Sequence, residues 1–227
     1  RPRSVGKAGG RGTGVGRHPE RMDPGHLAMF PLSTVLFPHA SMALHVFEPR
    51  YQALVSDCLA GDRRLGVVLI ARGPEVGGGD ERHDAGMLAS IDAAEPLGDG
   101  RWHLTVRGLR LLRVRRWLDD EPYPRAAVEE RAEGLVEDVG ALQLAEAELR
   151  RVRALLSELG RAPGLPAAPT LDASSEMVAW QLCALAPVTA FDRQRLLEAA
   201  APDERMALLL EMLRAAGDDL GRILAGG

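Results

Sequence analysis

Residues whose type and spacing could support catalysis are scarce in this sequence of 227 residues. The single lysine, Lys7, is followed by Ala8. A phosphate-binding loop with the spacing G-x-x-x-x-G-K-[ST] needs a lysine at the β and γ phosphates and a hydroxyl residue directly after it. A Ser-Lys catalytic pair also needs a lysine, and Gly77-Gly78-Gly79 does not stand between a strand and a helix as a nucleotide-binding loop would. The sequence therefore argues against ATP hydrolysis of this type and against a Ser-Lys protease.

Histidine and cysteine form no metal-binding or nucleophilic motif. The six histidines are His18, His26, His39, His45, His83 and His103. They lack the spacing of a zinc hydrolase such as HExxH, and Cys58 and Cys183 are far apart and outside any CxxC pattern. We predict no metal, no cofactor and no disulfide, with both cysteines as buried thiols. A hydrolase with a dispersed Ser, His and carboxylate triad stays open as a third class of function, because spacing alone does not reveal such a triad.

An arginine-rich segment, VRGLRLLRVRRW, is a candidate nucleic-acid surface. Its arginines are Arg107, Arg110, Arg113, Arg115 and Arg116, and Trp117 follows them. Arginines and an aromatic ring at neighbouring positions could bind phosphates and stack on a base. The alternative is a solvated sheet face whose arginines pair with acidic side chains. We favour this alternative because residues 27–227 carry 22 Lys and Arg against 30 Asp and Glu, so nucleic acid is not the expected partner.

The segment Glu48-Pro49-Arg50-Tyr51 could suggest acid/base chemistry, but a structural role explains it better. Proline has a fixed φ and suits the first turn of a helix. The residues that follow, YQALVSDCLAGD, have apolar positions at helical spacing and end at Gly61. We therefore predict a strand-to-helix corner, held by hydrogen bonds or ion pairs of Glu48 and Arg50.

Composition places the chain among globular proteins that can bury a substantial core. It is 46% hydrophobic and 26% charged, with a mean hydropathy of -0.09. The sequence has no run of 18 apolar residues, and its first residues lack the apolar stretch of a secretory signal, so we predict a cytoplasmic protein without a membrane span. Residues 1–27 are basic and glycine-rich, which predicts a disordered leader. A nucleic-acid-binding arm is the alternative for this segment.

The remainder changes from a strand pattern to a helical one. In residues 28–134, short apolar runs alternate with Gly, Pro and Asp, as strands require. Residues 72–86 are expected to form a polar loop, and Gly108 is expected to interrupt a strand. In residues 135–227, apolar residues recur three and four apart and predict four helices, one of them capped by Thr189. The sequence thus predicts an α+β fold with a β domain over 28–134 and a helical domain over 135–227.

Several short segments, in the same order, resemble the N-terminal substrate-binding domain of the Lon proteases. They are MFPLSTVLFPHASMALHVFEPRYQALV, LGVVLIA, GMLASIDAAEPLGDGRWHLTVRGLRLLRV, YPRAAVEE and VAWQLCALAPVTAFDRQRLLEAAAPDERMALLLEMLRAAGDDL. The resemblance covers nearly everything after the leader. It implies a PUA-like mixed β pseudo-barrel followed by an α-helical bundle, in a bacterial protein associated with proteolysis.

The resemblance also implies a function. In full-length Lon proteases this region helps to capture polypeptides, while separate ATPase and protease domains act on them. We therefore expect a non-catalytic module that binds unfolded or damaged polypeptides as an adaptor in protein quality control, serving a protease or a chaperone. RNA binding through the face from Arg107 to Arg116 is the alternative function, by analogy with other PUA-like folds. The sequence does not indicate the oligomeric state.

An extended guest would meet an apolar groove or a sheet edge. The candidate lining residues are Phe30, Phe37, Met42, Phe47 and Tyr51, together with the loop from Arg72 to Gly86. The groove between the β half and the helices is a second candidate. For each lining residue a place in the core is the alternative, and for the phenylalanines it is the favoured one.

Overall fold

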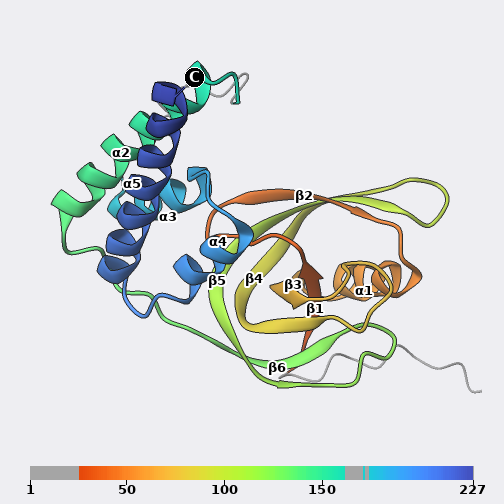
Figure 1. Cartoon of the computed structure of the whole chain (residues 1–227). Helices are drawn as coiled ribbons and strands as arrows, with labels where there is room; N and C mark the ends of the chain where they lie inside the picture. The colour runs from red at the N-terminus through yellow and green to blue at the C-terminus, as the bar shows by residue number, and fades with distance from the viewer. Residues whose placement is uncertain (1–25, 162–170, 172–173, 227) are drawn as a thin grey trace, which may run out of the picture.

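A curved sheet of six strands and five helices make up the described part of the chain, residues 26–161, 171 and 174–226 of the computed structural model (Figure 1). The strands are β1 (His26–Leu32), β2 (Ser41–Val46), β3 (Arg64–Arg72), β4 (Glu81–Pro96), β5 (Trp102–Trp117) and β6 (Arg125–Glu130), and the helices are α1 (Pro49–Ala60), α2 (Val139–Glu158), α3 (Ser175–Leu185), α4 (Ala190–Glu198) and α5 (Pro202–Gly226). The fold is of the α+β class, as the sequence predicts.

The predicted leader falls almost wholly outside the described residues. Its last two residues do not: His26 and Leu27 belong to β1 and pair with Ala127 and Ala126 of β6. The sheet therefore begins two residues earlier than the boundary predicted after Leu27.

Five of the strands close into a ring. The strand order is β2-β5-β4-β3-β1-β6, and an additional pairing between β6 and β5 closes β5, β4, β3, β1 and β6 into a ring. Within the ring β1 and β3 run parallel, and the other neighbours are antiparallel. The first part of the long strand β5 pairs with β2, and its last part pairs with β6. β2 thus extends the sheet beyond the ring, with β5 as its only strand partner in the described part of the chain.

β5 runs through Gly108, where the sequence predicted an interruption. A Cβ at this position would lie 2.2 Å from the carbonyl oxygen of Phe37. The Gly108 N–H donates to the Ala40 carbonyl oxygen at 3.0 Å, and the His39 N–H donates to the Gly108 carbonyl oxygen at 2.9 Å. Glycine here permits the segment that leads into β2 to approach the strand closely, and the strand continues with a register shift between Leu88 and Ala89 of β4.

β4 begins at Glu81, inside the segment predicted to be a loop. Its first residues are polar, and they pair with β3 through Arg72–Glu81 and Ile70–Arg82. A strand extension held by its ladder carries no alternating apolar pattern, so periodicity does not detect it. The loop is confined to residues 73–80.

The core comprises two apolar clusters. The smaller one contains Met29, Val68, Leu88, Leu112, Val114 and Ala126, which come from all five strands of the ring. The larger one contains buried residues of the strands, of α1, of the segment before β2 and of helices α2 to α5. A single apolar cluster therefore joins the sheet to the helical half. The rings of Phe37 and Trp180 lie 5.6 Å apart within it. Both cysteines are buried free thiols, as predicted.

The helical half is built on α2 and α5, which lie side by side and run in the same direction away from the sheet (Figure 1). The Asp203 carboxylate accepts hydrogen bonds from the N–H groups of Glu137 and Asp138 at the start of α2, and Arg151 reaches Asp218 further along at 3.4 Å. The Thr189 hydroxyl accepts from the Asp192 N–H at 3.1 Å and caps α4, which confirms that prediction.

A buried arginine anchors the junction between the two halves. The Arg205 side chain is 2% exposed, and its guanidinium lies 3.8 Å from the ring centroid of Trp180. Its Nε donates to the Leu196 carbonyl oxygen at 2.9 Å, and its Nη1 pairs with the Glu133 carboxylate. Burial raises the pKa of Glu133 above its ordinary value, although Arg205 opposes the shift. The buried charges of Arg205 and Glu133 therefore stabilise each other, and removal of either one leaves the other without its partner.

We expect Arg205→Met to lower the free energy of unfolding by about 3–5 kcal/mol, because it leaves the Glu133 carboxylate largely buried without its cation. The double variant Arg205→Met/Glu133→Gln should recover part of this loss. Urea denaturation of both proteins measures the two values. Equal losses in the single and double variants would contradict the assigned role of Glu133.

Candidate functional site

Three of the five predicted lining residues lie in the core. Phe30 and Tyr51 stack with their ring centroids 4.3 Å apart, and they are 6% and 3% exposed. Phe37 is 1% exposed against Trp180. These rings join β1, α1 and the helices, so they do not line an open groove, and the alternative of a core position applies to them.

The other two residues lie at β2. Met42 is half-buried within the strand, and Phe47, directly after the strand, is 47% exposed. The strand SMALHV contains no charged residue and no proline, which are the usual devices that protect an exposed edge. Because β5 is its only strand partner among the described residues, its outer edge offers main-chain N–H and C=O groups to another strand.

A hollow of about 410 Å³ lies on the face of the sheet over β2, β5 and β4. It is lined by Ala43, Leu44 and His45 of β2, His103, Leu104 and Thr105 of β5, and Ala93 and Glu95 of β4. The registers place Ala43, Thr105 and Ala93 in one row across the three strands. The side chains in that row are small, so they leave a depression in the surface of the sheet. The rings of His45 and His103 are 5.1 Å apart, and Phe47 is 5.9 Å from His45. We call Ser41–Val46, Phe47 and this hollow the β2 surface.

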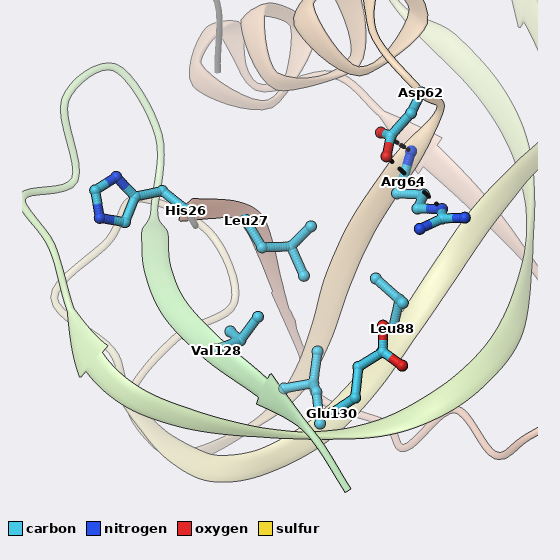
Figure 2. A pocket seen from close by; sticks show the side chains of 8 residues that line it. His26, Leu27, Asp62, Arg64, Leu88, Val128 and Glu130 are labelled. Carbon is cyan, nitrogen blue, oxygen red and sulfur yellow. Dashed lines mark hydrogen bonds and ion pairs between the residues drawn. The ribbon is translucent and has the colours of Figure 1, made fainter. Parts of the chain in front are cut away.

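A second hollow, of about 200 Å³, lies at one end of the ring (Figure 2). Its lining residues are His26, Leu27, Asp62, Arg64, Leu88, Leu112, Val128 and Glu130. Every strand of the ring contributes to it, as in the ligand-binding mouths of other barrels. We call it the barrel mouth.

The corner before α1 has a structural role. The Glu48 carboxylate accepts hydrogen bonds from Arg50 Nε at 3.2 Å and from the Gly77 N–H at 3.0 Å. Pro49 occupies the first turn, and the Arg50 guanidinium lies 4.4 Å from the centre of the Tyr51 ring. Glu48 and Arg50 therefore connect the corner to the loop over residues 73–80, instead of facing a substrate.

The same loop is held by a second group of charges. The Asp80 carboxylate accepts from Arg82 Nε at 2.5 Å, and Arg82 also pairs with Asp120. Burial alone would raise the pKa of Asp80, but the hydrogen bond from Arg82, a backbone hydrogen bond and the positive charges of Arg82 and Arg50 together hold the pKa below its ordinary value. The carboxylate of Glu75 accepts from the Ser33 N–H at 3.1 Å. The loop is thus fastened to the sheet at several points.

The arginines of β5 are largely engaged with acids. Arg107 pairs with Asp92 at 2.7 Å, Arg110 pairs with Glu130 at 2.7 Å, and Arg115 pairs with Glu129. The remaining two, Arg113 and Arg116, are exposed. The paired arginines are arranged as on a solvated sheet face, which was the favoured alternative to a phosphate-binding surface.

Residues 26–161, 171 and 174–226 contain no group of three or more His, Cys, Asp and Glu side chains arranged to hold a metal ion. In the same part of the chain, no helix combines the length and the apolar character needed to cross a membrane.

Comparison with known proteins identifies the family. The sequence model described as the ATP-dependent protease La (LON) substrate-binding domain matches residues 26–215. The chain belongs to this family. The Lon protease 2 of Sorangium cellulosum (strain So ce56) is 32% identical over 208 residues, which cover 87% of this chain and 25% of that protein. A LON peptidase N-terminal domain and RING finger protein of Schizosaccharomyces pombe is 22% identical over 79% of this chain and 43% of its own length.

A solved structure agrees with this assignment. The Lon N-terminal domain protein from Xanthomonas campestris superposes with a TM-score of 0.58 at 27% identity, over 82% of this chain and 97% of that one. The present chain spans about a quarter of the length of the Sorangium Lon protease, so the match concerns the substrate-binding domain and not the remaining three quarters.

Sequence reasoning missed most of the β2 surface. Within this Lon substrate-binding domain, Ala43, Ala93 and Thr105 are unremarkable in sequence, because small residues carry no chemical signal. Only their alignment across three strands makes a hollow. The alternation of SMALHV signals a strand, but whether that strand is central or at an edge depends on pairings distant in sequence.

We expect Asp80→Asn to lower the free energy of unfolding at pH 7 by about 1–3 kcal/mol, because Arg82 loses a charged, buried acceptor. The folded-state pKa of Asp80 lies below its ordinary value of 3.8. Its contribution is therefore present above pH 3.8 and is lost as the pH falls through the lower folded-state value. Urea denaturation between pH 7 and pH 3 should show the gap between wild type and variant closing below pH 3.8. A gap that does not change with pH would contradict this assignment.

Proposed function

We propose that this domain binds extended polypeptide segments at the β2 surface and thereby selects polypeptides for a protease or a chaperone. Membership of the Lon substrate-binding domain family supports the general role. The observation that carries the specific proposal is the unprotected edge of β2, which lacks charge and proline and has one strand partner among the described residues.

The binding mode follows from strand chemistry. A guest strand that pairs with β2 forms main-chain hydrogen bonds, each contributing about 0.5–1.5 kcal/mol, which require no particular sequence. Alternate side chains of the guest point to the same face of the sheet, where the hollow and the exposed Phe47 ring can accept apolar groups. Such a site favours unfolded chains over folded ones, because a folded protein has few free main-chain groups to offer.

The adaptor role rests on the relatives. The two named above carry this domain within a Lon protease and within a protein whose name joins it to a RING finger. We propose that the domain's contribution in each setting is recognition, and that cleavage depends on other domains. RNA binding is the weaker alternative, because three of the five arginines on β5 are already paired with carboxylates.

We expect Ala43→Lys to weaken binding of unfolded casein by about five- to ten-fold, because a charged side chain on an edge strand opposes strand addition. Ala215→Lys, the same change at an exposed position of α5, should leave binding unchanged. Fluorescence anisotropy with labelled casein measures both, and matching urea midpoints confirm that both variants are folded. Equal affinities of the two variants would contradict a site at β2.

A further inference from the structure

The barrel mouth has an apolar floor and a charged rim. Leu88 and Leu112 are buried at its base, while Leu27 and Val128 are half-buried. Figure 2 shows the side chains of Leu27 and Val128 near each other, on the neighbouring strands β1 and β6. A volume of about 200 Å³ is of the size of one large side chain and too small for a folded segment.

The rim carries charges of both signs, with Asp62 and Glu130 as acids and Arg64 as a base. Glu130 and Leu88 line the same hollow, and the guanidinium of Arg64 points away from Leu27 and Val128 (Figure 2). The Asp62 carboxylate accepts a hydrogen bond from the Arg64 N–H at 3.2 Å and lies 3.7 Å from the Arg64 guanidinium, an exposed and loose ion pair. Glu130 is half exposed and keeps acceptor capacity beyond its contact with Arg110. The rim can therefore accept a further cationic group.

The net negative charge of the whole domain also favours a positively charged guest. Residues 27–227 carry eight more acidic than basic side chains, which gives a field that attracts positively charged segments. An apolar floor with carboxylates at its rim suits an apolar side chain that has a cation beside it.

We propose that the barrel mouth binds one leucine-sized or phenylalanine-sized side chain of an extended polypeptide, with a flanking arginine or lysine of the same segment against Glu130 and Asp62. This proposal deepens the proposed function and rests on it: it adds a second contact, distinct from the β2 surface, that gives the domain a sequence preference. Strand addition at β2 depends on main-chain groups of the guest, whereas the barrel mouth recognises one apolar side chain and the basic residue next to it in the guest sequence.

Three labelled peptides of glycine and serine, with a central Arg-Leu-Arg, Arg-Ala-Arg or Glu-Leu-Glu, test the preference by fluorescence anisotropy with the full chain. We expect the Arg-Leu-Arg peptide to bind at least about ten-fold more tightly than Arg-Ala-Arg, because the alanine leaves the apolar floor unfilled. It should bind at least about five-fold more tightly than Glu-Leu-Glu, because the rim repels acids. Equal binding of all three peptides would overturn the proposal.

A matched pair of variants distinguishes the effect of the rim carboxylate on peptide binding from the effect of net charge. Glu130→Arg should weaken binding of the Arg-Leu-Arg peptide by about two- to five-fold. Glu129→Arg makes the same change at the neighbouring residue of β6, whose side chain is partly exposed and whose carboxylate pairs with Arg115 and does not line the mouth. It should have a smaller effect than Glu130→Arg. Equal losses in the two variants would assign the preference to net charge and would overturn the proposal.

Methyl NMR locates the peptide directly. Binding at the barrel mouth should shift the methyl signals of Leu27, Leu88, Leu112 and Val128 and give contacts from the peptide leucine to them. Shifts confined to Leu44 and Val46 would support the β2 surface as the binding site and would overturn the present proposal. Absence of peptide binding, with casein still bound and sensitive to Ala43→Lys, would also overturn it while leaving the proposed function intact.

Discussion

The guanidinium of Arg205 is the contact on which the relation of the two halves depends. It lies against Trp180, which in turn packs on Phe37, and it pairs with Glu133 just after the last strand. Neighbouring contacts have the same effect. The Arg131 guanidinium donates to the carbonyl oxygens of Leu197 and Glu198. The helices are thereby attached to both the beginning and the end of the sheet.

The contacts that attach the helices to the sheet also position the β2 surface. Phe37 belongs to the segment that crosses Gly108 and leads directly into β2. The position of β2 on β5 therefore depends on a packed ring on one side and on the missing Cβ of a glycine on the other. A buried ion pair is a weak source of net stability, and its better-attested effect is to fix one arrangement among several. In this domain the arrangement that is fixed includes β2 paired with β5 at the edge of the sheet.

The sequence predicted the elements whose signals are local. The corner at Pro49, the cap at Thr189, the helical stripe that includes Leu149 and the buried thiols all follow from neighbouring residues. It did not predict the polar beginning of β4, because Arg82 is held there by its strand partners and by an ion pair with Asp80, and such polar residues give no alternating apolar pattern.

The candidate site was predicted only in part for a related reason. Aromatic residues indicate binding and core packing equally well, and Phe30, Phe37 and Tyr51 belong to the core. Phe47 remains exposed beside β2, while the hollow next to it comes from strand register. The barrel mouth needs residues from five strands, so no local pattern marks it.

Hydrogen–deuterium exchange on the full chain, with and without unfolded casein, is the most direct test of the central claim that an extended polypeptide adds to the edge of β2. The account predicts slower exchange of amides within Ser41–Val46 when casein is bound, because outward N–H groups gain carbonyl acceptors from the guest. Unchanged exchange in this strand, at a casein concentration that saturates the domain, would contradict it.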